Sequence, residues 1–272
     1  MLNKPLIDPK KQILIVYIVL MLATLAVFWQ VNQYGFINLD DPIYVTENSH
    51  IQSGFTLEGI RWAFSTTYAE FWHPLTWLSL MLDYKLYGLN AGGYHLTNLI
   101  LHILSTLLLF WLFNRMTGMI WRSAFIAAFF ALHPLHVESV AYISERKDVL
   151  SIFFWMLTLC LYIYYTEKPV IKRYLLVLFC FVCGLMSKAM VVTLPVVMIL
   201  LITGRWDDCS PQNRNHQQQK LPDLFLHGNC GRKYHFLSFP QFFPSSRFMS
   251  NTIRPQKIYP WVPGSHPHLF LL

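Results

Sequence analysis

The sequence predicts an all-α integral membrane protein, a polytopic bundle of about six transmembrane helices. Hydrophobic residues make up 54% of its 272 positions and charged residues only 13%, whereas a soluble domain carries about a quarter. Residues 13–31 form a run of about 19 residues without a charge, long enough to cross a bilayer. Further apolar runs follow, separated by segments that carry charges.

The first apolar run predicts an uncleaved helix whose N-terminus lies in the cytoplasm. Lys4, Lys10 and Lys11 precede it, and lysines favour the cytoplasmic side of a span. The run is not followed by a cleavage site of small residues, so we do not expect a secretory signal peptide. The residues directly after this helix therefore face the outside.

Residues 32–93 predict a long first external loop with two helices of its own. Thr56 is typical of a helix cap, with Glu58 in the first turn. Pro74 suits the first position of a second helix, which Gly88 ends. Tryptophan and tyrosine crowd this loop, so we expect interfacial helices along the outer membrane surface; a small aqueous domain with its own core is the alternative. The apolar faces expected are Leu57, Ile60 and Phe64 in the first helix, and Leu75, Leu78 and Leu82 in the second.

The remaining spans alternate across the bilayer. They are predicted at 96–113, 119–132, 149–165, 174–186 and 191–202. The last two are short, so they must thin the bilayer or pack inside the bundle. We therefore expect residues 1–202 to form the transmembrane domain. Residues 203–272 carry scattered prolines and no helical or strand period, which predicts a disordered tail that arises from a frame change or truncation.

An acidic pair follows the first helix directly. Asp40 and Asp41 precede Pro42, and a residue before proline favours an extended backbone. The two carboxylates should then point to different sides of the chain, one toward a reaction centre and one into the loop. Asp40 is the preferred base, because Pro42 constrains Asp41. A solvated turn is the alternative interpretation.

Three basic residues fall on the predicted outer side, against the usual bias. Arg146, Lys147 and Lys188 each lie at the end of a span, so a bundle would bring them to the level of the acidic pair. Cations there can hold a phosphate, and a carboxylate can take a proton from a hydroxyl, which indicates transfer from a lipid-linked phosphosugar. Alternatively, the run from Glu145 to Asp148 neutralises itself and Lys188 reaches along the interface.

Two further observations concern cofactors and partners. His133, His136 and Glu138 could contribute to a metal site, but their spacing matches no zinc signature, and hydrogen bonding within the bundle is the stronger interpretation. No cofactor is identified, and a divalent ion stays open. The net charge is +7, but its excess is concentrated in the tail, so we expect membrane lipid rather than nucleic acid as a partner.

Several motifs resemble the membrane domain of the transmembrane and tetratricopeptide-repeat protein family, which is similar to the protein O-mannosyltransferases of the GT-C glycosyltransferase superfamily. The motifs are 36–41, 72–77, 92–98, 131–141 and 145–151. The resemblance implies a polytopic enzyme that uses a polyprenyl- or dolichyl-phosphate sugar, typically mannose, and a protein acceptor. Its active-site acidic pair falls on Asp40 and Asp41. Arg146, Lys147 and Lys188 fall on motif positions that we assign to the donor phosphate, with Glu145, His73, His133, His136 and Glu138 as supporting residues.

The resemblance extends over residues 35–201. It implies a location in a bacterial inner membrane or the endoplasmic reticulum, with transfer at the outer or luminal face. Family members continue with further spans and 34-residue repeats, so an inactive, shortened enzyme is one expectation. The chain could instead be a non-catalytic scaffold, or a transporter of a lipid-linked or anionic substrate. A transporter would favour an inverted repeat and charges near the middle of the spans, and the sequence has neither.

Overall fold

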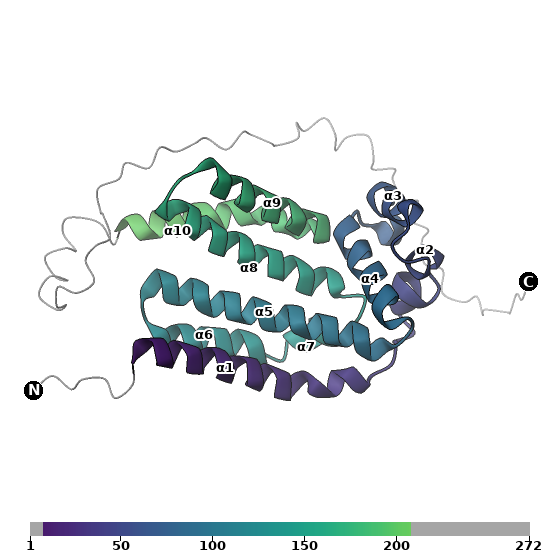
Figure 1. Cartoon of the computed structure of the whole chain (residues 1–272), viewed down its shortest axis with the longest axis horizontal. Helices are drawn as coiled ribbons and strands as arrows, with labels where there is room; N and C mark the ends of the chain where they lie inside the picture. Colours follow the sequence, from purple (N-terminus) through teal and green to yellow (C-terminus); the bar gives the residue numbers. More distant parts are fainter. Residues whose placement is uncertain (1–7, 208–272) are drawn as a thin grey trace, which may run out of the picture. The chain divides into compact units, whose positions relative to one another are not determined.

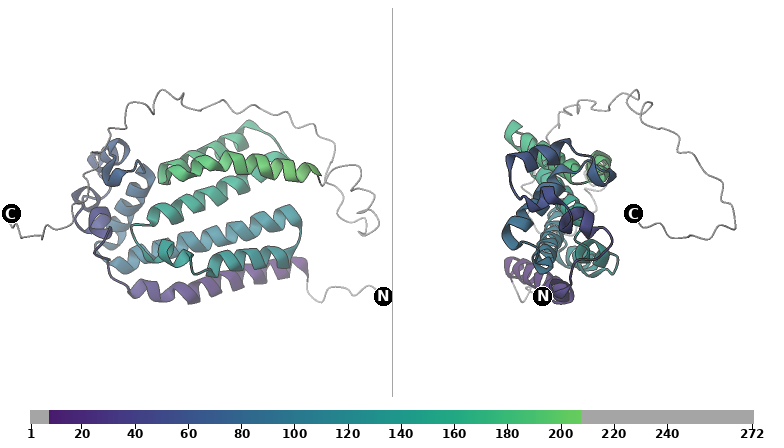
Figure 2. Two further views of the ribbon diagram at one scale, coloured as in Figure 1. Left: turned by 180° about the vertical axis from the view of Figure 1, so that it is seen from behind. Right: turned by 90° about the vertical axis from the view of Figure 1, so that its right-hand side faces the viewer.

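The described part of the chain is a helical bundle with a cap of short helices at one end. The structure, a computed structural model, describes residues 8–207, which contain helices and no strand. The long helices lie side by side, and the short helices α2 to α4 gather beyond one end of them (Figure 1, Figure 2). We call this the capped end.

The long elements correspond to the apolar runs of the sequence. Three helices within residues 8–207 are long and apolar enough to cross a membrane, which confirms an all-α membrane bundle. They are α1 with the 3-10 turn η1, α5 and α8; the number of membrane crossings stays a prediction. The bounds are α1 Pro9–Phe28, η1 Trp29–Gln33, α5 Ala91–Thr117, α6 Ile120–Leu132, α7 His136–Ala141, α8 Arg146–Glu167, α9 Ile171–Ser187, η4 Ala189–Thr193 and α10 Leu194–Asp207. The predicted tail lies outside the described residues from residue 208 onward.

Helix α5 is central to the bundle. It packs against α1, α6 and α8, and α9 covers α8 on the other side (Figure 1). Its buried seam includes polar side chains that find partners inside the bundle: His102 Nε2 lies 3.0 Å from the carbonyl of Ala131, and Thr106 donates to the carbonyl of His102. Apolar side chains on the outward faces of α1, α6 and α9 are exposed, as expected for helices that face lipid.

Two of the cap helices have ends that the sequence predicted: α3 begins after Thr56, and α4 begins at Pro74 and ends at Gly88. The bounds of the cap elements are the π-helical turn η2 Pro42–Thr46, α2 Ser49–Gln52, α3 Leu57–Ser65, η3 Tyr68–Glu70 and α4 Pro74–Tyr87. Thr56 Oγ1 accepts from the backbone N–H of Gly59 at 3.0 Å, and Gly88 ends α4 with a φ of 61° that glycine adopts without a steric penalty.

The predicted apolar faces of these two helices are not the faces that pack in the core of the cap. Leu57 in α3 and Leu82 in α4 are 66% and 46% exposed. Instead α3 buries Gly59 and Ala63, where small residues allow close approach to the rest of the cap. Helix α4 buries a large aromatic and aliphatic face, because its core contacts come from η2, α2 and α3 rather than from the bundle alone. Whether the helices lie along the membrane surface stays a prediction.

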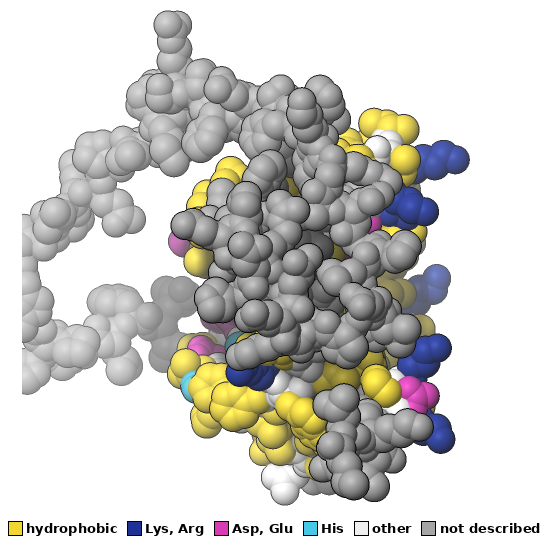
Figure 3. Space-filling model, turned by 90° about the vertical axis from the view of Figure 1, so that its left-hand side faces the viewer, with side chains coloured by type: hydrophobic (Ala, Val, Ile, Leu, Met, Phe, Trp, Pro, Cys, Tyr) yellow, Lys and Arg dark blue, Asp and Glu magenta, His cyan; other side chains and the backbone are white. Residues whose placement is uncertain are grey.

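The opposite end of the bundle is basic. The helix ends there carry Lys10 and Lys11 of α1, Arg115 of α5, Arg122 of α6, and Lys172 and Arg173 of α9. Figure 3 looks onto this end and shows lysine and arginine side chains along one margin of the described surface. The two ends of the bundle therefore differ in charge.

Candidate active site

The capped end brings together the three turns that carry the predicted site residues. Asp40 and Asp41 follow η1, Glu145 and Lys147 begin α8, and Lys188 follows α9. All three turns lie where the long helices meet the cap (Figure 1). Because the long helices run up and down the bundle, the chain returns to this end several times. Site residues as much as 148 positions apart in the sequence therefore lie at the same end.

Asp41 anchors the first loop from within. Its side chain is buried, with 1% of its surface exposed, and its two oxygens accept from the backbone N–H groups of Ile37 at 2.8 Å and Ser144 at 3.1 Å. The expected extended backbone is wrong, because Asp41 is helical, with φ −60° and ψ −31°. These two hydrogen bonds hold it there, and Pro42 then begins η2.

Asp40 has the opposite environment. Its side chain is half-buried, and among the side chains described, those of residues 8–201, it has no hydrogen bond or ion pair through its carboxylate. Its backbone carbonyl accepts from the N–H of Tyr44 at 3.0 Å, so one turn of η2 fixes its position. A carboxylate that is held by its backbone and free at its tip can accept a proton from a bound hydroxyl.

The ring of Tyr44 is the centre of the site. Lys147 Nζ lies 5.0 Å from the ring centroid, a distance typical of a cation–π contact. Burial raises the pKa of the Tyr44 phenol, the Lys147 ammonium opposes this shift, and the charges of Glu145 and Asp40 add to it. The tyrosine, the lysine and the free carboxylate are therefore within electrostatic reach of one another.

Lys147 is already paired within its own turn. Its ammonium lies 3.1 Å from a carboxylate oxygen of Glu145 and donates to the backbone carbonyl of Ser144 at 3.3 Å. Its side chain keeps 15% of its surface exposed. An incoming phosphate can therefore reach this cation, in competition with one carboxylate.

His73 and Trp77 complete an aromatic stack beneath Tyr44. The His73 ring is nearly parallel to the Tyr44 ring, at 12° and 5.8 Å between centroids, and lies 4.6 Å from the Trp77 ring. Burial, and secondly the charge of Lys147, lower the pKa of His73 to about 4. The imidazole is therefore neutral at physiological pH and packs as an aromatic ring.

Arg146 does not present its guanidinium to the capped surface. The residue is fully buried and uses four of its five N–H groups inside the protein. It donates to Asn98 Oδ1 and Asp83 Oδ2 at 2.5 Å each, and to Ser79 Oγ and the Tyr94 carbonyl at 2.9 Å each. This arrangement, which we call the Arg146 clasp, joins the start of α8 to α4 and α5. A phosphate could reach it only by breaking these bonds.

The carboxylate of the clasp is a residue that the sequence reasoning missed. Burial raises the pKa of Asp83, while Arg146 and a hydrogen bond from Thr97 Oγ1 at 2.9 Å stabilise its charged form. Asn98 supports the segment before α8 as well, because its side-chain amide donates to the carbonyls of Val140 and Tyr142. An acid on the apolar face of α4 was the available signal, because such a residue requires a partner.

Lys188 belongs to a neighbouring turn of the same end. It forms an ion pair with Asp148 of α8, and its side chain is 30% exposed. The preceding residue is tied to the cap, since Thr76 Oγ1 of α4 donates to the Ser187 carbonyl at 3.1 Å. Lys147 and Lys188 are thus the two predicted cations that stay accessible, and each is paired with a carboxylate of the α8 turn.

The remaining predicted residues lie beside α6. His133 Nδ1 accepts from the N–H of Leu135 at 3.2 Å, and the His136 ring packs at a tilt against the rings of His102 and Phe130. Glu138 lies in the first turn of α7 and is exposed. Among the described side chains of residues 8–201, no group of three or more metal-ligating residues could hold an ion. Hydrogen bonding and aromatic packing are what the structure assigns to His133 and His136.

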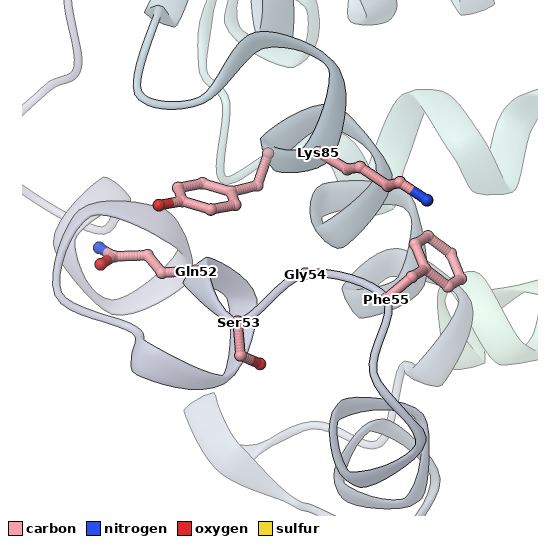
Figure 4. Close-up of a pocket in the computed structure, with 6 residues that line it drawn as sticks. Gln52, Ser53, Gly54, Phe55 and Lys85 are labelled. Carbon is pink, nitrogen blue, oxygen red and sulfur yellow. The ribbon is translucent and has the colours of Figure 1, made fainter.

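A separate pocket of about 350 Å³ opens in the cap. It is lined by Gln52, Ser53, Gly54, Phe55, Tyr84 and Lys85. Figure 4 shows Gln52 and Phe55 on opposite sides of the opening, with the Lys85 side chain extending above Phe55. None of the predicted site residues lines it, so this pocket is distinct from the group around Tyr44.

Comparison with known proteins identifies the family. The family model for dolichyl-phosphate-mannose-protein mannosyltransferases matches residues 60–219, more than half of the chain. The chain belongs to this family. The matched segment contains Glu145, Lys147 and Lys188, whereas Asp40 and Asp41 precede it.

Curated relatives agree with this family and with the resemblance carried by the sequence motifs. The Drosophila melanogaster protein O-mannosyl-transferase Tmtc1 is 29% identical over 174 residues, which cover 61% of this chain and 19% of that protein. Human protein O-mannosyl-transferase TMTC1 is 32% identical over 137 residues (45% and 15%), and mouse TMTC2 37% over 92 residues (34% and 11%). The chain thus spans less than a fifth of these relatives. No solved structure matches it.

Proposed function

We propose that the chain transfers a mannose-like hexose from a polyprenyl or dolichyl phosphate to a hydroxyl of a protein serine or threonine. The observation that carries the proposal is the arrangement around Tyr44. A free carboxylate, Asp40, and an accessible ammonium, Lys147, act on the same phenol at one end of a membrane bundle. Family membership supports this choice of substrates, as does the O-mannosyl-transferase activity for which the relatives are named.

In this reaction Asp40 takes the proton of the acceptor hydroxyl. The hydroxyl oxygen then bonds to C1 of the sugar, and the bond between C1 and the phosphate oxygen breaks. The polyprenyl phosphate leaves with that electron pair, and Lys147 and Lys188 stabilise its charge. A phosphate is a competent leaving group, so the step requires no second carboxylate as a general acid.

Asp41 and Arg146 position the residues that act on the substrate. Asp41 holds the loop that carries Asp40 against the turn before α8. Arg146 holds the start of α8, which carries Lys147. We therefore assign Arg146 to positioning the phosphate-binding lysine rather than to the phosphate itself.

The animal relatives favour the endoplasmic reticulum over a bacterial membrane. The capped end then faces the lumen and the N-terminus faces the cytoplasm. The basic opposite end agrees with this orientation, because lysine and arginine favour the cytoplasmic side of a span (Figure 3).

Transfer in proteoliposomes tests the proposal. Purified chain receives a radiolabelled polyprenyl-phosphate mannose and a peptide rich in serine and threonine. Asp40→Asn should lower transfer about 100-fold or more, the usual contribution of a general base. Glu58→Gln is the matched control, because Glu58 is an exposed acid of the same cap. Equal transfer by wild type and Asp40→Asn would exclude Asp40 as the base, and no transfer by folded wild-type chain would contradict the function.

A further inference from the structure

Two buried polar atoms of the aromatic stack have no partner. His73 Nε2 and Trp77 Nε1 are buried and make no hydrogen bond to any residue in the range 8–201, whose side chains the structure describes. The side chains are 2% and 0% exposed, and their ring centroids lie 4.6 Å apart. A buried polar group without a partner costs about 1–3 kcal/mol and calls for a water or a ligand to satisfy it.

The chemistry of the two atoms narrows the choice of ligand. The indole N–H of Trp77 can only donate. The neutral imidazole of His73 can accept through one nitrogen and donate through the other. A hydroxyl group accepts from the indole and pairs with either tautomer of the imidazole, whereas an ammonium cannot accept from Trp77 and a carboxylate pairs with both atoms only in the tautomer that carries the proton on Nε2.

The position of the pair is also informative. The Tyr44 ring lies 4.9 Å from the Trp77 ring and 5.0 Å from the Lys147 ammonium, between the unpartnered atoms and the proposed phosphate-binding cation. In a phosphosugar the hydroxyls are within a few bonds of the phosphate. A phosphate at Lys147 therefore brings sugar hydroxyls to the neighbourhood of His73 and Trp77.

A strained segment lies next to the pair. Ala69 and Glu70 have φ angles of 57° and 65°, a left-handed conformation that side chains other than glycine rarely adopt. The flanking rings are tilted against the stack, with the Tyr68 centroid 6.2 Å from that of Trp77 and the Phe71 centroid 6.4 Å from that of His73. These two rings are 47% and 59% exposed, so they can move toward solvent and release the strain.

From these observations we propose that His73 Nε2 and Trp77 Nε1 together bind one hydroxyl of the donor sugar, after segment 68–71 lifts from them. This inference rests on the proposed function and makes the pair the part of the site that distinguishes one hexose from another. Losing such a hydrogen bond in a buried site weakens binding about tenfold.

Binding of monodeoxy donors tests the proposal. Full-length chain in nanodiscs is titrated with a polyprenyl-phosphate mannose and with analogues that each lack one sugar hydroxyl. We expect one analogue to bind wild type about tenfold more weakly than the parent. Trp77→Phe, which removes only the indole N–H and some volume, should bind the parent and that analogue equally.

Trp72→Phe is the matched control. Trp72 belongs to the same cap, but its indole N–H already donates to the Phe64 carbonyl at 2.9 Å. This variant should keep the tenfold preference for the parent donor. If Trp77→Phe does not fold, the analogue series on wild type and His73→Asn supplies the same comparison.

The outcomes separate this inference from the function on which it rests. Equal binding of every deoxy analogue to wild type would overturn the inference alone. An equal loss of parent and analogue affinity in Trp77→Phe would also overturn it, since that pattern indicates a resident water. If the wild-type chain bound no donor, both this inference and the proposed function would be overturned.

Discussion

Asp40 and Asp41 are adjacent in one turn but have different structural roles. Replacing each of them should therefore affect the stability of the protein differently. Asp41 is buried and accepts two backbone N–H groups, whereas Asp40 is half-buried with a free carboxylate. Asp41→Asn turns one acceptor into a donor that faces an N–H, which should cost about 1–3 kcal/mol.

The two asparagine variants are each other's controls. With about 2–4 °C per kcal/mol for a domain of this size, Asp41→Asn should lower the thermal midpoint in detergent by several degrees. Asp40→Asn should leave the midpoint within about 1 °C of wild type while transfer falls. A midpoint that falls equally in both variants would contradict the assignment.

The buried histidine predicts a loss of stability in acid. His73 has a pKa of about 4 in the folded protein, below the 6.5 of an unfolded chain. Between pH 6.5 and pH 4 the unfolded chain binds the proton and the folded chain does not, so the free energy of unfolding falls as the pH falls through that window. Above pH 6.5 this contribution is complete.

Thermal midpoints measured from pH 7.5 to pH 4 check this expectation. Wild type should lose more stability across the window than His73→Gln, which carries no titrating group at this position. His133 is less buried and lies beside α6, so His133→Gln is the comparison and should follow the wild-type curve. Parallel curves for wild type and His73→Gln would show that His73 protonates freely in the folded state.

At the scale of the elements, the Arg146 clasp should be strongly coupled. Removing one partner of a buried ion pair leaves an uncompensated charge and costs about 3–5 kcal/mol. Arg146→Met and Asp83→Leu should each be destabilising, and the double variant should cost less than the sum of the two by more than about 1 kcal/mol. Thermal unfolding of the three variants measures this coupling.

The ion pair between Arg115 and Glu167 is the matched control, because its side chains are 54% and 31% exposed. Exposed pairs contribute about 0–1 kcal/mol, so Arg115→Met should change the midpoint little. Additive losses at Arg146 and Asp83 would show that the two residues act independently.

The junction between α4 and α5 allows no side chain at Gly93. A Cβ atom there would lie 2.2 Å from Cγ of Tyr87, so Gly93→Ala must displace the tyrosine and should cost about 1–3 kcal/mol. Gly35→Ala is the control, since nothing lies within 4 Å of its added Cβ. Limited proteolysis measures whether the α4–α5 junction opens, because an open junction is cleaved faster. Equal protection of the two variants from cleavage would contradict the close contact between Gly93 and Tyr87.

The elements were predictable to the extent that local signals determine them. Charge-free runs located the long helices, while Thr56 and the pair Pro74 and Gly88 located the ends of the cap helices. The helix faces were not predictable from periodicity alone, because the cap forms a core of its own around Trp77. The conformation of Asp41 depends on Ser144, which lies 103 positions away.

The site was predictable in part for the same reason. The sequence brings charged residues to the ends of spans, and the structure places them at one end. The sequence does not reveal which cation is buried. Arg146 and Lys147 are neighbours, and only the partners of Arg146 on α4 and α5 distinguish them. Tyr44 and Trp77 resembled ordinary interfacial aromatics.

For the whole molecule, the two ends should be reachable from opposite sides of the membrane. Leu57 lies in cap helix α3 and is 66% exposed; Lys172 lies at the opposite end and is exposed. With the native cysteines replaced by serine, an impermeant maleimide applied to sealed microsomes should label Lys172→Cys at once. Leu57→Cys should react only after the vesicles are permeabilised. The reverse pattern would invert the proposed orientation.

The Arg146 clasp also imposes an order on biosynthesis. Asp83 emerges from the ribosome 63 positions before the arginine that neutralises it, a delay of about 3–13 s at 5–20 residues per second. During that interval the cap holds an acid without its counter-charge. The candidate site is therefore complete only after α8 has been synthesised, because the clasp that fixes the start of α8 needs both residues.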